Sequence, residues 1–180
     1  MNALLPGSFF NVYTYSTMFN LRKSHKKVDW RLNHEKSLQV ILWIASQAPG
    51  KADIYKVVKT LFWADYYHIK KYGRLVTGDD YVAMPLGPVP SYCYDLLSRN
   101  VWAVGKLKRA ELPFTINGNI VSGAEPDPGF FSRSDIEALS YGWGRVKDLP
   151  FNTIRDESHE IEEYKRVRAE RQTEADVMDV

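Results

Sequence analysis

The stretch from Leu61 to Asp95 constrains the fold most, because it joins an aromatic-rich helical pattern to a segment dense in glycine and proline. Asp65 lies on the apolar stripe of that pattern, four residues from Leu61 and four from Ile69. Since an unpaired buried carboxylate is costly, we expect Asp65 to be buried and to accept hydrogen bonds that brace the segment downstream. The stripe repeats at steps of three, four and seven, as on one face of a helix: Ile54, Val57, Val58, Leu61, Phe62 and Ile69.

A glycine ends this helical pattern. Gly73 follows Lys70 and Lys71, and cations in a last turn interact favourably with the helix dipole. Glycine also tolerates the left-handed conformation that is common just past a helix. The pattern therefore predicts a helix that begins near Asp53, a capping residue type, and ends at Gly73.

The segment that follows is predicted to be stiff. Gly87 permits backbone conformations closed to other residues, whereas each proline fixes φ and removes an amide donor. Such a density of prolines excludes a regular helix or a central strand, so we expect a fixed elbow. The next helix is predicted from Ser91 to Ser98, with Ser91 as its N-cap or, alternatively, Pro90 as its first residue. Three prolines fall within six residues here: Pro85, Pro88 and Pro90.

Three further patterns complete a mainly α (α+β) domain. Asn33 is a good N-cap for a helix that Pro49-Gly50 closes, and this helix should form an antiparallel hairpin with the next one. Asn-Gly between alternating apolar residues predicts a type I′ β-hairpin around Phe114–Val121. Between these, Leu75–Met84 fits a short extended pair or an irregular loop.

The last third of the chain is predicted to be helical. Ser132 followed by Asp135 resembles a capping box, with Ile136 and Leu139 on the inner face of the helix. A short helix is expected from Asn152 or Thr153, and a highly charged one from residue 157 onward.

Composition limits the class of protein. One hundred and eighty residues, 44% of them hydrophobic, suit a single domain with a real core. The net charge of +2 predicts no strong affinity for nucleic acid. Cys93 is the single cysteine, which excludes an internal disulfide framework and suits a reducing, cytoplasmic environment. No apolar run is long enough to span a membrane, so we expect no membrane partner.

Charge and aromatic content divide the chain into three parts. Residues 1–32 carry aromatic side chains without a period and then a basic run, so we expect an extension that is disordered or folds on a partner. Residues 33–164 form the predicted domain. Residues 165–180 form a charged C-terminal tail, and the two ends could equally be solvated termini without a partner.

Catalytic and metal chemistry are not expected. Asp65 and His68 lie three residues apart and can meet on one helix face, but no pair of cysteines and no H-E-x-x-H motif supports a metal site. Cys93 lies in the first turn of a helix, where a thiol pKa is lowered, yet free cysteines are usually inert packing residues. The sequence has no nucleophile elbow, phosphate loop or dinucleotide motif. We therefore expect no enzyme activity and no cofactor.

The motifs of the central stretch together resemble a known family. The string Phe62-Trp63-Ala64-Asp65-Tyr66-Tyr67-His68-Ile69-Lys70-Lys71-Tyr72-Gly73-Arg74 is followed by Thr77-Gly78-Asp79, Gly87-Pro88-Val89-Pro90, Tyr94-Asp95-Leu96-Leu97, Phe131-Ser132 and Ser158-His159. This series is similar to the Panacea domain of SocA-like antitoxins and covers roughly residues 33–164. The resemblance implies an antitoxin that binds its cognate protein toxin directly and performs no chemistry. The resemblance does not identify the toxin, because members of this family are paired with unrelated toxins.

The residues expected to contact a partner lie on the second helix and the helix after the elbow. Tyrosines near rigid turns offer a large contact area and lose little side-chain freedom on binding. Alternatively, each could pack at the edge of the hydrophobic core and contact no partner. The predicted partner-binding residues are Tyr67, His68, Lys71, Tyr92 and Tyr94, and the predicted structural residues are Asp65, Gly73, Gly87, Pro88 and Pro90.

Two other functions stay open at this point. An adaptor that delivers a partner protein to a protease would use a similar binding face. A DNA-binding repressor would use the basic stretch Arg22–Arg31, although no recognition helix is evident and only non-specific phosphate contacts are expected. Self-association also stays open.

Overall fold

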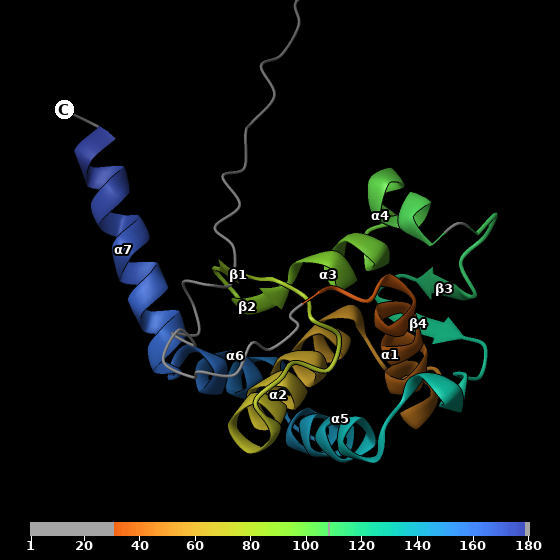
Figure 1. The fold of residues 1–180 in the computed structure, drawn as a ribbon. Coiled ribbons are helices and arrows are strands. Elements are labelled where there is room, and N and C mark those ends of the chain that lie inside the picture. Colours follow the sequence, from red (N-terminus) through yellow and green to blue (C-terminus); the bar gives the residue numbers. More distant parts are fainter. Residues whose placement is uncertain (1–30, 108, 179–180) are drawn as a thin grey trace, which may run out of the picture.

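The computed structural model describes residues 31–107 and 109–178 and shows a mainly α, α+β fold (Figure 1). These residues form seven α-helices and two separate antiparallel β-hairpins. The elements in chain order are α1 (His34–Gln47), α2 (Ile54–Tyr72), β1 (Tyr81–Met84), β2 (Gly87–Pro90), α3 (Ser91–Leu97), α4 (Val101–Lys106), β3 (Phe114–Asn117), β4 (Ile120–Gly123), the 3-10 turn η2 (Pro128–Phe130), α5 (Arg133–Val146), α6 (Phe151–His159) and α7 (Glu162–Met178).

Helix α2 is the central element, and α5 runs beside it along most of its length (Figure 1). The two helices approach closely because Gly142 has no side chain. A Cβ at Gly142 would overlap the carbonyl of Thr60 and the amide of Ala64. Hairpin β1–β2 and helices α1, α3 and α6 also contact α2 or the hairpin that covers it, so α2 is the frame for the rest of the domain.

Four of the predicted helix boundaries are confirmed. The side chain of Asn33 caps α1 by accepting from the amide of Lys36, and Asp53 caps α2 in the same way. Gly73 ends α2 with φ of 71° and donates its amide to the carbonyl of Ile69. Ser132 and Asp135 form a complete capping box at α5. These features were readable because each depends only on residues within one turn of the helix end.

Hairpin β1–β2 shows that the proline-rich segment is a strand. Tyr81 pairs with Pro90, and Met84 pairs with Gly87. A proline cannot donate to a ladder, but this sheet has two strands, so each strand is an edge where prolines are tolerated. The prediction of a fixed elbow missed this pairing, whereas the exclusion of a central strand is consistent with it.

Hairpin β3–β4 lies where it was predicted, but its turn is shifted. Asn117 pairs with Ile120, so the two central residues are Gly118 and Asn119 rather than Asn117 and Gly118. Gly118 alone has a positive φ, of 59°. Glycine at the first central position is the pattern of a type II′ turn, so the predicted type I′ turn is wrong.

Other differences concern the second half of the chain. Ile136 is 36% exposed, whereas Leu139 is buried as predicted. Helix α4 was not predicted, and α6 begins at Phe151, just before the expected start. The charged last helix begins at Glu162 rather than at residue 157, and it continues across the boundary expected after residue 164. The predicted N-terminal extension lies outside the described residues, except for positions 31 and 32.

Candidate protein-binding site

Asp65 is fully buried and holds the start of β1 against α2. Its carboxylate accepts the amide of Val76 at 2.6 Å and the hydroxyl of Tyr81 at 2.8 Å. Burial raises the pKa of Asp65 to about 7, and the two donors act in the opposite direction. The predicted burial and acceptor role are thus confirmed, but the braced segment lies before the Gly-Pro residues rather than within them.

A second buried carboxylate caps α3 from a distance. Asp79 accepts the amides of Tyr92 and Cys93, each at 2.9 Å. The position before α3 is occupied by Pro90, which makes no side-chain capping bond, so the expected N-cap role of Ser91 is wrong. The sequence analysis placed Asp79 in a family motif but missed its capping role, because its partners are 13 and 14 residues away and meet it only once β1 and β2 pair.

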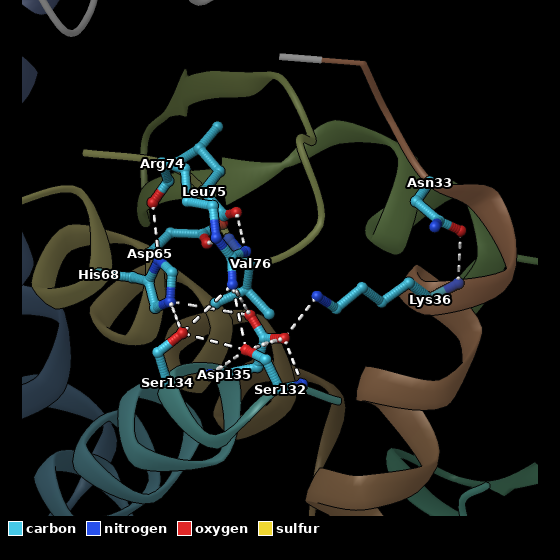
Figure 2. Close-up of polar contacts among 10 residues, drawn as sticks. All are labelled: Asn33, Lys36, Asp65, His68, Arg74, Leu75, Val76, Ser132, Ser134 and Asp135. Atoms are coloured by element: carbon cyan, nitrogen blue, oxygen red, sulfur yellow. Dashed lines mark hydrogen bonds and ion pairs between the residues drawn. The ribbon is translucent and has the colours of Figure 1, made fainter. Parts of the chain in front are cut away.

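The buried carboxylate of Asp135 joins α1, the end of α2 and α5 (Figure 2). It receives the Lys36 ammonium at 2.7 Å and the Arg74 guanidinium at 2.8 Å. Burial alone would raise the pKa of Asp135, but Lys36 and the capping bonds from Ser132 outweigh it and hold the pKa below its usual value. This network fixes the three helices relative to one another.

His68 belongs to the same network and is 0% exposed. Figure 2 shows its ring between Arg74 and Ser134. Nδ1 lies 2.8 Å from the carbonyl oxygen of Arg74, and Nε2 lies 3.0 Å from the hydroxyl of Ser134. A partner cannot reach a side chain in this position, so the predicted partner-binding role of His68 does not fit the structure.

Tyr92 is likewise interior, with 2% exposure. Its hydroxyl donates to the carbonyl of Ala103 at 2.9 Å, which ties α3 to α4. The predicted contact role of Tyr92 is therefore corrected to a structural one. The helical period could not reveal this, because α4 covers the ring from outside α3.

Gly87 and a buried lysine shape the hairpin beneath α6. Lys59 is 0% exposed and donates to the carbonyl of Pro88 at 3.0 Å. Gly87 has φ of 98°, and a Cβ there would overlap the Lys59 ammonium and the Ser158 hydroxyl. Burial lowers the pKa of Lys59 to about 7. Gly87 is thus required both for its backbone conformation and for the space that Lys59 occupies.

Tyr67 and Lys71 remain at the surface, on a face that α2 shares with α5. Lys71 and the hydroxyl of Tyr67 both donate to the Glu137 carboxylate, and Tyr72 donates to it at 2.6 Å. The ring of Tyr67 stacks on Tyr141, with centroids 4.5 Å apart. We call these five residues the tyrosine surface. Hydrogen bonds from Lys71, Tyr67 and Tyr72 lower the pKa of Glu137 to about 2, and the bond from Lys71 has the largest effect.

Tyr94 lies elsewhere, on the wall of an apolar groove of about 970 Å³. The groove is bounded by the first turns of α2 and α6, the tip of hairpin β1–β2, the end of α3 and the β3–β4 turn. The rings of Tyr55 and Phe151 pack at 4.4 Å between centroids, and the Tyr55 hydroxyl donates to the carbonyl of Leu86. We define the apolar groove by six side chains: Tyr55, Met84, Leu86, Tyr94, Ile120 and Phe151.

The predicted contact residues are thus divided between two surfaces and the interior. Tyr67 and Lys71 lie in the tyrosine surface, Tyr94 lies in the apolar groove, and His68 and Tyr92 are buried. Sequence reasoning missed Glu137 and Tyr141, which α5 brings to α2. The sequence did indicate that both residues lie off the buried face of α5, which includes Ala138 and Leu139. Only the packing of α5 shows which helix they face.

Within the described residues, no helix is long and apolar enough to cross a membrane. That part of the chain also contains no group of three or more His, Cys, Asp or Glu side chains placed to hold a metal ion. Cys93 is buried, and burial together with the neighbouring Asp79 raises its pKa well above the usual value, which disfavours the reactive thiolate.

The family model described as "Antitoxin SocA-like, Panacea domain" matches residues 57–165, more than half of the chain. The chain therefore belongs to the SocA-like antitoxin family with a Panacea domain. The match begins within α2 and ends in the first turn of α7, so it includes both hairpins, the tyrosine surface and most of the apolar groove. No curated protein and no solved structure shows a significant match to the chain.

Proposed function

We propose that this protein is the antitoxin of a toxin–antitoxin pair and neutralises its cognate protein toxin by direct contact. The observation that carries the proposal is the family match over residues 57–165. A toxin partner follows from membership of an antitoxin family. The buried, unreactive position of Cys93 disfavours inactivation of the toxin through this thiol.

The tyrosine surface is the toxin contact that we propose. Tyr72 and Tyr141 are 42% and 38% exposed, and both are aromatic anchors of the kind that dominate binding energy. Glu137 holds three donors from α2, while Tyr141 stacks on Tyr67. These contacts order the rings before a partner arrives, so binding would freeze few side-chain rotors.

A growth-rescue assay with the cognate toxin tests the proposal. We expect Tyr72→Ala and Tyr141→Ala to weaken rescue while the melting temperature changes little, because both side chains are exposed. Val101→Ala, at an 88% exposed apolar residue on α4, is the matched control and should rescue fully. Full rescue by both tyrosine variants would exclude this surface as the toxin contact.

Co-purification distinguishes masking from the alternatives. A stable stoichiometric complex with an unchanged toxin level supports masking, whereas toxin that disappears only when a protease is present would indicate an adaptor. DNA binding with a steep dependence on salt concentration would indicate a repressor. The basic stretch that a repressor would use lies almost entirely outside the described residues.

A further inference from the structure

The apolar groove is a surface that the described residues leave uncovered. Leu86 is 48% exposed, Phe151 is 42% exposed and Tyr94 is 38% exposed. Large contiguous apolar surfaces of this kind usually mark a binding site. The groove lies apart from the tyrosine surface, because it adjoins the first turn of α2 whereas Tyr67 and Lys71 lie in the last two turns.

The chemistry of the groove favours an uncharged occupant. Its two charged members already have partners within the domain. Asp53 accepts the amide of Lys56 as the cap of α2, and the Lys56 ammonium donates to the carbonyl of Lys147 at 2.9 Å. These two charges are opposite in sign, so a charged side chain entering the groove would lose its hydration against a lining that is mostly apolar and carries no net charge.

One segment of this chain has the required composition. Residues 1–20 contain no Lys, Arg, Asp or Glu, and the basic residues begin only at Arg22. Twenty residues without a charge are unusual beside a domain in which charged residues are common. The hydrophobic members of this segment are Met1, Ala3, Leu4, Leu5, Phe9, Phe10, Val12, Tyr13, Tyr15, Met18 and Phe19.

The point where the described chain begins places that segment within reach. Asn33 donates its amide to the carbonyl of Thr77, and the carbonyl of Arg31 lies against Gly78. The described chain therefore begins beside Asp65 of α2, because Asp65 binds the amide of Val76, the residue before Thr77. The groove lies at the level of Ile54, about 16 Å away along the helix axis at 1.5 Å per residue.

Residues 21–30 are long enough to connect the two places. Ten residues span up to about 33 Å when extended, about twice the separation along α2. A segment tethered at this length has a local concentration in the millimolar range, so even a weak apolar contact would be well occupied. A segment from another molecule has no such advantage at ordinary protein concentrations.

We propose that residues 1–20 dock in the apolar groove of their own chain, where they cover Leu86, Tyr94 and Phe151. This inference does not depend on the tyrosine surface or on the identity of the toxin. It assigns the aromatic residues of the N-terminal segment an intramolecular partner.

Limited proteolysis of the full chain tests the proposal, using a protease that cleaves after aromatic residues. Cleavage within residues 1–20 should be about tenfold or more slower in the native chain than in the double variant Leu86→Asp/Phe151→Asp, because cleavage follows the population of the undocked state. Both positions are exposed, so the fold should tolerate the change, and a cooperative melting transition confirms it. The control Val101→Asp places a charge on an exposed apolar residue of α4 that does not line the groove, and this variant should be cleaved at the native rate.

A second measurement identifies the occupant directly. A photo-crosslinker at position 94 should form links to residues 1–20 within one molecule, with a yield that does not depend on protein concentration. Equal cleavage rates in the native chain and the groove variant would overturn the proposal. Links that form only between two molecules, or that rise with concentration, would overturn docking in the same chain and assign the groove to a second copy.

Discussion

The carboxylate of Asp79 accepts the amide of Tyr92 at 2.9 Å and so caps a helix that begins twelve residues later in the chain. The cap depends on hairpin β1–β2, which returns the chain to Asp79. Pro90 supplies no side-chain oxygen at the usual capping position, and a remote carboxylate replaces it. The helix start is therefore specified by a tertiary contact.

Replacing Asp79 with Leu should destabilise the domain, because it leaves the amides of Tyr92 and Cys93 without an acceptor inside the protein. The expected loss is on the order of 1–3 kcal/mol, which lowers the melting temperature by several degrees. Thermal denaturation followed by circular dichroism measures it. Asp79→Asn keeps one side-chain oxygen as an acceptor at nearly the same size, so it should lose less stability and serves as the control. An equal melting temperature in the two variants would contradict the capping role.

Replacing Asp65 with Leu should also destabilise the chain, since the amide of Val76 and the hydroxyl of Tyr81 both lose a buried acceptor. We expect a loss on the order of 1–3 kcal/mol or more. The double variant Asp65→Leu/Tyr81→Phe removes one of the stranded donors and should recover part of the loss. Chemical denaturation of the native chain and the variants measures this recovery, and strictly additive losses would argue against the bond.

Gly73→Val should lower the melting temperature, because valine strongly disfavours the positive φ of 71° at this helix end. The strain should cost on the order of 1–3 kcal/mol. Gly144→Ala is a matched control inside α5, where no atom lies near an added Cβ and the helix favours alanine over glycine. It should leave stability unchanged or raise it. An unchanged melting temperature in Gly73→Val would show that the helix end can be rebuilt without cost.

The buried ammonium of Lys59 predicts a specific dependence of stability on pH. Its pKa is about 7 in the folded chain, below the ordinary value of 10.5, because burial disfavours the charged form. Between these two pH values the unfolded chain binds more protons than the folded chain, so the free energy of unfolding rises with pH. The full difference corresponds to about 5 kcal/mol as an upper limit.

The variant Lys59→Met isolates this contribution. The free energy of unfolding of this variant, relative to that of the native chain, should be largest near pH 7 and below. The difference should shrink as the pH rises toward 10.5, because the native chain gains stability over this range. Urea denaturation of both chains across this range measures the difference. Two curves that stay parallel would show that Lys59 keeps an ordinary pKa in the folded chain.

Local chemistry in the sequence determined much of the fold. The α2 stripe, the caps at Asn33 and Asp53, the end of α2 at Gly73 and the capping box at Ser132 all depend on residues within one or two helical turns. The burial of Asp65 was predictable for the same reason, since its place on the stripe follows from the helical period. The mainly α class follows from these elements.

The tertiary structure alone decided which of the chemically suitable side chains reach the surface. His68 and Tyr92 are residue types that often anchor a partner, yet both are buried. His68 bonds Ser134 at the start of α5, and Tyr92 bonds Ala103 in the following helix α4. Tyr67 becomes part of an ordered surface only because α5 brings Glu137 and Tyr141 to it. A helical period states which residues share a face, but the element that covers that face is set by packing between distant parts of the chain.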